Sequence, residues 1–159
     1  MLFKLPPRPP SGPPDPALEI VSFPEGEGRI ATLVGWPREP ASQATCRRLP
    51  PPDNGLAASH PLDYTLVLRA LRWTAARPAL VRAVEACGAG ASRGARAAGR
   101  SEPQYALRFE RLGVPIEARG ILLEREGESL LLELEAPAAK LPIVDGLFDR
   151  WVREVAAGR

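Results

Sequence analysis

Tyr105-Ala-Leu-Arg-Phe-Glu-Arg-Leu112 is the stretch that decides the fold, because apolar and polar residues alternate along it. Tyr105, Leu107 and Phe109 share one parity, and polar residues fall between them. Alternation with a period of two is typical of a strand that buries one face. Two further apolar runs follow after short turns, at residues 116–125 and 130–135. This spacing predicts an antiparallel meander of three strands.

The second and third runs carry two finer signals. Ile121 and Leu123 break the parity of the residues before them, which predicts a β-bulge near Gly120. Glu133 and Glu135 share one parity of the third run. A pair of carboxylates on one strand face could meet a substrate, but the plainer interpretation is the solvent face of an amphipathic strand. We therefore expect both glutamates to be exposed.

A C-terminal helix is predicted after the meander. Pro142 suits its first turn, where the missing N–H is not needed. Apolar residues then recur every three or four positions and form one broad stripe: Val144, Leu147, Phe148, Trp151, Val152 and Val155. The stripe needs an apolar partner, and the nearest one is the meander, so we expect this helix to lie across the sheet.

Weaker patterns precede the meander. The pattern of residues 17–36 predicts a hairpin that could extend the sheet. Residues 37–61 are rich in proline, which indicates a loop or linker. Tyr64–Trp73 fits a strand or a helix, and its β-branched and aromatic composition favours a strand. Residues 75–87 fit a helix that ends at Gly88.

These elements predict one α+β domain over residues 17–159, in which an antiparallel sheet is packed by the C-terminal amphipathic helix and one further helix. Residues 88–103, rich in Arg, Gly and Ala, are expected to form a mobile loop. The order helix, meander, helix is similar to that of double-stranded-RNA-binding domains. The lysine cluster that opens the C-terminal helix of that family is represented here by Lys140 alone, so no family is assigned.

Composition narrows the function classes. The chain of 159 residues has a formal net charge of +2, which is too small to imply a polyanionic partner by itself. No run approaches the roughly 18 apolar residues of a membrane span, and no apolar run of signal-peptide length follows Met1. A reducing cytoplasm is therefore the expected compartment, with Cys46 and Cys87 as free thiols, although one disulfide is possible.

Residues 1–16 are dense in proline and predict an extended, flexible tail. Lys4, Pro7 and Pro10 match the basic-x-x-Pro-x-x-Pro pattern that aromatic grooves of partner proteins bind. A proline-dense segment matches this pattern easily, so a solvated tail is the simpler interpretation.

Three arginines lie in the predicted mobile loop: Arg93, Arg96 and Arg100. Guanidinium groups bind phosphates well, so this loop is a candidate for weak, salt-dependent contact with nucleic acid. No aromatic residue lies among them to stack on a base, and a solvated linker is the simpler interpretation.

No catalytic residue, metal ligand set or cofactor is predicted. His60 is the single histidine, and Asp63 lies close enough in sequence to orient it. A nucleophile such as Cys46 or Cys87 would have to join them in space, and a lone loop histidine is the simpler interpretation. One histidine and two distant cysteines do not make a zinc pattern.

The sequence as a whole predicts a non-enzymatic binding or assembly module with the proline-rich tail as a possible contact to a protein partner. Two alternatives stay open. The first is a nucleic-acid-associated protein that uses the arginine loop. The second is a small-molecule or lipid carrier with a pocket between the sheet and the C-terminal helix. The oligomeric state is left open.

Overall fold

A computed structural model describes residues 16–74, 78–88 and 100–158. Its elements in chain order are β1 (Leu18–Ser22), the 3₁₀-helix η1 (Pro24–Gly26), β2 (Arg29–Leu33), β3 (Arg38–Pro40), β4 (Asn54–His60), β5 (Asp63–Thr74), α1 (Pro78–Gly88), β6 (Gln104–Arg111), β7 (Val114–Arg125), β8 (Glu128–Pro137), the 3₁₀-helix η2 (Ala138–Lys140) and α2 (Leu141–Ala156). The tail residues Lys4, Pro7 and Pro10 lie outside the described residues, and so do Arg93 and Arg96.

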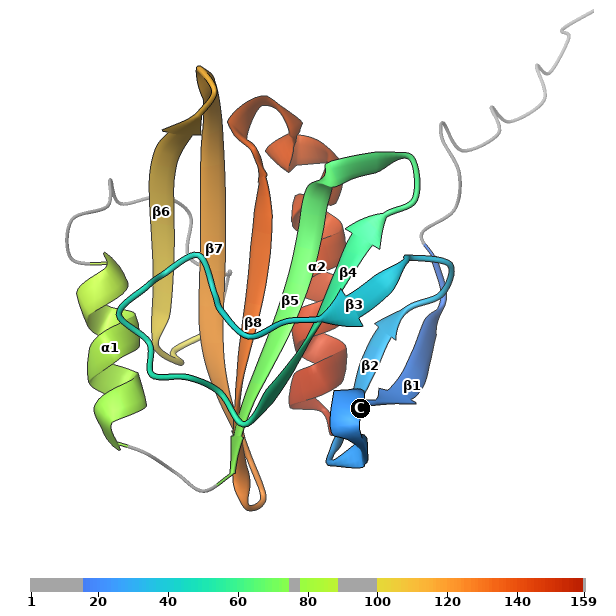
Figure 1. The fold of residues 1–159 in the computed structure, drawn as a ribbon, viewed down its shortest axis with the longest axis vertical. Helices are drawn as coiled ribbons and strands as arrows, with labels where there is room; N and C mark the ends of the chain where they lie inside the picture. The colour runs from blue at the N-terminus through green and yellow to red at the C-terminus, as the bar shows by residue number, and fades with distance from the viewer. Residues whose placement is uncertain (1–15, 75–77, 89–99, 159) are drawn as a thin grey trace, which may run out of the picture.

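The main sheet has six antiparallel strands in the order β3-β4-β5-β8-β7-β6 (Figure 1). The predicted α+β class is confirmed, and so are the meander β6-β7-β8 and the C-terminal helix. β5 pairs with β8, so β8 becomes a central strand, and its residues from Ser129 to Pro137 are all buried. Both faces of the sheet are therefore covered at its centre.

Coverage of both faces explains why the predicted bulge near Gly120 is wrong. Pairing between β7 and β8 runs without a shift from Arg125↔Glu128 to Ile116↔Pro137. Ile121 and Leu123 are apolar because they face the core on one side of the sheet, while Leu122 faces a second core on the other side. Apolar residues therefore occupy both parities of β7 because both of its faces are buried there, and the backbone itself is regular.

The segment Tyr64–Trp73 is a strand, as its composition favoured, and lies within β5. The predicted loop over residues 37–61 is partly wrong, because it contains β3 and all of β4. β4 has the sequence Asn-Gly-Leu-Ala-Ala-Ser-His, whose small residues carry little strand signal of their own. Pairing with β5 makes it a strand, which no local pattern could indicate.

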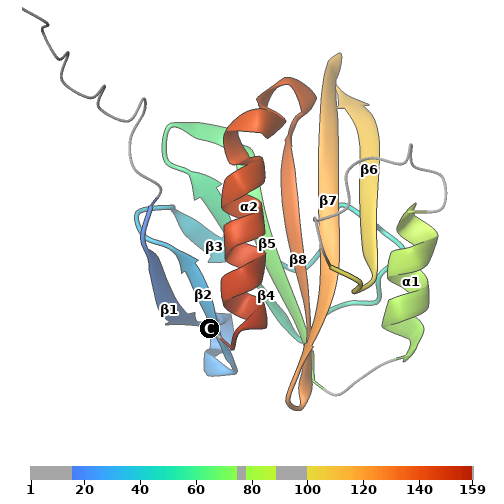
Figure 2. The ribbon, with the colours of Figure 1, turned by 180° about the vertical axis from the view of Figure 1, so that it is seen from behind.

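The predicted N-terminal hairpin is present as β1 and β2, but it does not extend the main sheet. It forms a separate two-stranded sheet beside α2, as Figure 2 shows. Phe23, Ile30 and Leu33 of this segment belong to the same buried cluster as Phe148 and Trp151 of α2. The hairpin thus adds to the core through its side chains rather than through strand pairing.

The two helices pack against opposite faces of the main sheet. α2 lies across the back face, which faces the viewer in Figure 2, and its apolar stripe fills a large core with side chains of β4, β5, β7 and β8. α1 lies beside β6 and supplies Leu80, Val84 and Cys87 to a smaller cluster on the front face, which faces the viewer in Figure 1. Tyr105 and Trp73 belong to the same front cluster.

A disulfide joins Cys46 to Cys87, so the prediction of free thiols is wrong. The two Cα atoms are 6.0 Å apart, within the usual range for a disulfide. The bond ties the loop between β3 and β4 to α1 across 41 residues of sequence. The cytoplasmic prediction assumed free thiols, and this assumption does not hold. Disulfides form and persist mainly in oxidising compartments.

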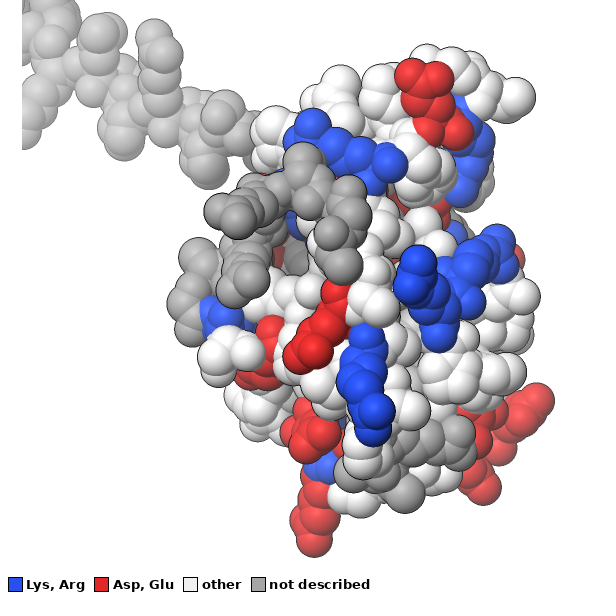
Figure 3. Space-filling model, turned by 90° about the vertical axis from the view of Figure 1, so that its left-hand side faces the viewer, with Lys and Arg blue, Asp and Glu red and all other residues white. Residues whose placement is uncertain are grey.

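Charge is mixed on the side of the molecule formed by α1 and β6. Basic and acidic side chains of the described residues are interspersed there, as Figure 3 shows. The described part of this surface therefore does not create the one-sign field that steers a polyanion. None of the described helices has the length and apolar content needed to cross a membrane.

Trp151 is the first residue with which to test the packing of α2. Its side chain is buried, and its indole Nε1 donates a hydrogen bond of 2.8 Å to the carbonyl oxygen of Ala31 in β2. We expect Trp151→Ala to lower the free energy of unfolding by about 3–5 kcal/mol, because it empties a large buried volume. The exposed Arg153→Ala on the same helix should change it by less than about 0.5 kcal/mol. Equal urea midpoints for the two variants would contradict this packing.

The turn between β4 and β5 gives a second test. Lys140 Nζ lies 2.5 Å from Asp63 Oδ2, and the hydrogen bonds from Lys140 and Thr65 lower the pKa of Asp63 from 3.8 to about 2. The pair therefore contributes its full stability above pH 3.8 and loses it as the pH falls through about 2. We expect Lys140→Met to raise the pKa of Asp63, measured by NMR titration of the carboxyl carbon. An unchanged pKa would show that Lys140 does not hold the turn.

Candidate functional site

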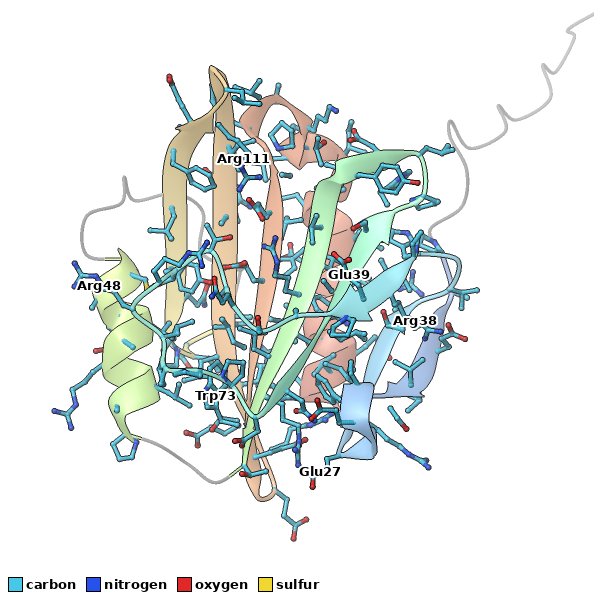
Figure 4. All side chains as sticks on the ribbon, viewed as in Figure 1. Glu27, Arg38, Glu39, Arg48, Trp73 and Arg111 are labelled. Carbon is cyan, nitrogen blue, oxygen red and sulfur yellow. A yellow bond between two sulfur atoms is a disulfide. The ribbon has the colours of Figure 1, made fainter. Side chains whose placement is uncertain are left out.

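A pocket of about 570 Å³ opens on the front face, on the side of the sheet opposite α2. We call it the front-face pocket and define it by its lining residues: Glu39, Pro40, Ala41, Ser42, Gln43, Ala44, Thr45, Arg47, Ala57, Arg69, Leu107, Arg108, Phe109, Arg111 and Glu135. Its volume is in the range typical of sites for small ligands. In Figure 4, Arg111 and Glu39 lie on opposite sides of this region.

Three parts of the fold build the front-face pocket. The central strands β5 and β8 supply Arg69 and Glu135. The segment from Glu39 to Arg47 forms one wall, where β3 ends and the chain crosses the front of the sheet (Figure 1). The upper part of β6 forms the other wall, with Leu107 and Phe109 as its apolar residues. Their alternation along β6 directs both toward the same face as Arg69 and Glu135.

A buried carboxylate lies behind the lining. The side chain of Glu133 is fully buried and accepts hydrogen bonds from three residues. Thr45 donates its backbone N–H at 3.0 Å and its hydroxyl at 2.9 Å, Arg69 donates from Nη1 at 2.9 Å, and the hydroxyl of Tyr105 donates to Oε2. The loop, β5, β6 and β8 therefore meet at one carboxylate.

Glu135 holds two arginines at the pocket. Its Oε2 lies 2.6 Å from Nη1 of Arg69, and its Oε1 lies 2.7 Å from Nη2 of Arg111. Burial opposes ionisation of Glu135, but the charges and hydrogen bonds of Arg69 and Arg111 outweigh this effect and lower its pKa. Glu135 is therefore ionised at neutral pH, and it fixes the distance between two guanidinium groups.

Tyr105 is held neutral in this cluster. Burial and the negative charge of Glu133 raise the pKa of Tyr105 well above its ordinary value of 10.0. Its ring lies against Gly120 of the neighbouring strand, where any Cβ atom would overlap the ring. Gly120 is thus required for the close approach of Tyr105, and not for a bulge.

The front-face pocket has the chemistry of an anion site with an apolar side. Three arginines, Arg47, Arg69 and Arg111, line it together with Glu39 and Glu135. The side chain of Arg108 pairs with Glu117 on the opposite face of the sheet, so its charge does not belong to the pocket. With the buried Glu133 included, the formal charges balance, and the anion-binding character comes from the N–H groups that the arginines leave free. Among the described residues, hydrogen bonds of Arg69 use only Nη1, and those of Arg111 use only Nη2. The remaining guanidinium N–H groups are available for a carboxylate, sulfonate or phosphate oxygen.

The candidate residues chosen from the sequence do not form this site. Arg100 pairs with Glu102 at 2.7 Å, away from the front-face pocket. His60 accepts a hydrogen bond from the backbone N–H of Leu62 and packs against Trp36 with ring centroids 5.2 Å apart. Cys46 and Cys87 are bonded to each other and offer no thiol nucleophile.

Two further expectations need correction. Glu133 and Glu135 are 0% and 3% exposed, so they do not lie on a solvent face. The predicted carrier pocket between sheet and C-terminal helix is replaced by a core of buried side chains, and the front-face pocket lies on the opposite face. Within the described residues, no group of three or more His, Cys, Asp or Glu side chains could hold a metal ion.

One signal in the sequence could have revealed the buried glutamates. Leucines occupy both parities from Leu130 to Leu132, and Leu134 continues one of them, which is typical of a strand covered on both faces. A glutamate within such a strand must be buried and therefore needs a cationic partner. Arg69 stands directly opposite Glu133 in the adjacent strand, but this pairing is evident only once β5 is placed beside β8.

Comparisons with known proteins assign no family. No protein-family model matches the chain, and neither does any curated protein. The solution structure of cyanobacterial PsbP (CyanoP) from Synechocystis sp. PCC 6803 is similar with a TM-score of 0.45 and 10% sequence identity, over 94% of this chain and 96% of that one. A likeness this distant says nothing about the function of this chain.

The contact between Gly120 and Tyr105 can be tested with a matched pair of substitutions. We expect Gly120→Ala to lower the free energy of unfolding by about 1–3 kcal/mol, because the new methyl group overpacks the Tyr105 ring. Gly146→Ala on α2 meets no atom within 4 Å and should raise it by about 0.5–1 kcal/mol, because alanine favours a helix. Urea unfolding measures both. A neutral Gly120→Ala would show that the ring is not held there.

Proposed function

We propose that the protein is a non-enzymatic binding module and that it binds a small anionic ligand in the front-face pocket. The observation that carries this proposal is the pairing of Arg69 and Arg111 with the two oxygens of one buried carboxylate, Glu135. A shared carboxylate holds both guanidinium groups in place before a ligand arrives. Less conformational entropy is then lost on binding.

The geometry of the two arginines supports an anion rather than a cation as the ligand. The side chain of Arg69 is 22% exposed and that of Arg111 is 59% exposed, so both can reach a ligand. The side chain of Glu135 is only 4% exposed and already accepts from both arginines, so it offers little to a cation. Guanidinium groups bind carboxylate and phosphate oxygens through charge-assisted hydrogen bonds.

The apolar residues in the walls of the front-face pocket favour a ligand that has an apolar portion. Leu107 and Phe109 line one side of the front-face pocket, and Pro40 and Ala41 line the other. Arg111 lies over the ring of Phe109, 5.4 Å from its centroid, which adds a cation–π contact to its ion pair. An organic acid or an organic phosphate with an apolar portion fits this combination better than an inorganic ion.

The other functions predicted from the sequence have less support. A protein partner for Lys4, Pro7 and Pro10 stays a proposal about residues outside the described part of the chain. A nucleic-acid contact through the arginine loop is weakened at Arg100, whose charge is already paired with Glu102. The front-face pocket is the site that the described residues favour.

Two fluorescent probes of similar shape test the proposal. The anionic probe is 8-anilinonaphthalene-1-sulfonate, and the neutral probe is N-phenyl-1-naphthylamine, which lacks the sulfonate. We expect Arg111→Ala to weaken binding of the anionic probe about tenfold or more, because a charge-assisted hydrogen bond contributes roughly 1.5–3 kcal/mol. Binding of the neutral probe should not change.

Arg153→Ala is the matched control, because Arg153 is an exposed arginine on α2, on the opposite side of the sheet. Both probes should bind Arg153→Ala as they bind the unaltered protein. Circular dichroism should show that Arg111→Ala is folded at the assay temperature, although the loss of the ion pair with Glu135 lowers its melting temperature. Equal affinity of the anionic probe for Arg111→Ala and for the unaltered protein would overturn the proposal.

A further inference from the structure

The wall of the front-face pocket is a segment without regular structure. Residues 41–53, between β3 and β4, form neither helix nor strand. Backbone hydrogen bonds hold both ends, from Ala41 N–H to Gly55 and from Asp53 N–H to Arg72. Near its second end, the carbonyl of Pro51 also accepts from the Trp73 indole at 3.1 Å. The part that lines the pocket therefore needs other anchors.

Two anchors hold that part, and they are adjacent in sequence. Thr45 binds the buried carboxylate of Glu133 through its N–H and its hydroxyl. Cys46 is bonded to Cys87 of α1, which is itself packed in the front cluster. Because the two residues are neighbours, the disulfide determines where Thr45 can lie.

We propose that the front-face pocket is assembled only in the oxidised protein and that reduction of Cys46–Cys87 releases its wall and weakens ligand binding. This inference rests on the proposed function. Release of Thr45 removes two donors from Glu133, and Arg69 then remains as a cationic donor shared by Glu133 and Glu135. Arg69 is drawn toward the carboxylates and away from the ligand, while the wall from Ser42 to Arg47 moves out.

A route for a reductant is present on the other side of the same segment. A second pocket of about 310 Å³ is lined by Cys46, Leu49, Leu71 and Pro50 to Pro52, among others. Cys46 is only 6% exposed, but it lines this pocket, through which a small thiol can reach its sulfur. Ser42, Gln43, Ala44 and Arg47 line both pockets, so a movement of this segment alters both.

The reaction is a thiol–disulfide exchange with a small dithiol. A thiolate of the dithiol attacks Sγ of Cys46, which breaks the protein disulfide, and Cys87 leaves as a thiolate and takes up a proton. The second thiol of the reductant then attacks the mixed disulfide and releases Cys46. The protein gains two electrons and two protons, and the dithiol becomes a cyclic disulfide.

The test compares three samples: the oxidised protein, the same protein reduced with dithiothreitol, and the double variant Cys46→Ser/Cys87→Ser. We expect 8-anilinonaphthalene-1-sulfonate to bind the reduced protein and the double variant about tenfold more weakly than the oxidised protein. The loss of a charge-assisted hydrogen bond to the probe has an effect of this size. Equal affinity for oxidised and reduced protein would overturn the inference. If the oxidised protein itself fails to bind in a way that depends on Arg111, the proposed function fails instead.

Hydrogen exchange separates the two failures, because it needs no ligand. The amide of Thr45 should be protected in the oxidised protein and exchange at least about tenfold faster after reduction, while the amides of β8 stay protected, as expected for local opening. Unchanged protection of Thr45 would overturn the inference even if probe binding falls. Loss of protection throughout β8 would also overturn it, because the disulfide would then stabilise the whole fold rather than one wall.

Discussion

The carboxylate of Glu133 is the constraint on which the front of the molecule depends. It lies on the central strand with no exposure to solvent, where an unpaired charge would be very costly. Its donors come from the loop, from β5 and from β6, so those three segments must converge on one point. The position of Tyr105, the requirement for Gly120 and the course of the loop all follow from this convergence.

A requirement for stability alone does not explain this cluster. Buried ion pairs contribute little net stability, and apolar residues of similar volume often do as well or better. The back face shows that alternative over most of its area, with a core formed by leucine, isoleucine and aromatic side chains under α2, although it also buries Glu117 between Arg108 and Arg119. The front face buries two carboxylates, Glu133 and Glu135, beneath Arg69 and beside a pocket, and such an arrangement is understandable where guanidinium groups must be held toward a ligand.

Local patterns predicted the elements whose residues repeat with a clear period. The meander and both helices are of this kind, whereas the strand at Tyr64–Trp73 fitted both periods and was favoured by its composition. β4 was missed because its small residues acquire a strand conformation only by pairing with β5. The N-terminal hairpin was predicted, but periodicity cannot say which sheet a hairpin joins.

The site was not predictable either, because it depends on contacts between residues that are far apart in sequence. Arg69 and Glu133 are 64 residues apart in sequence, and Thr45 and Glu133 are 88 apart. Each residue alone resembles an ordinary surface residue of its strand or loop. Only the placement of β5 beside β8 turns two expected solvent-facing glutamates into buried anions that must have partners.

The disulfide and the buried carboxylate act on neighbouring residues of one otherwise irregular segment. A segment of this length, fixed only at its ends, retains many conformations, and each added anchor removes part of that freedom. Cys46 fixes the segment to α1 through a covalent bond, while Thr45 fixes it to β8 through hydrogen bonds. The covalent anchor survives changes of pH and salt but not reduction, whereas the polar anchor depends on the segment already being close. The redox state of one bond therefore determines whether the carboxylate beneath the pocket has its full set of partners.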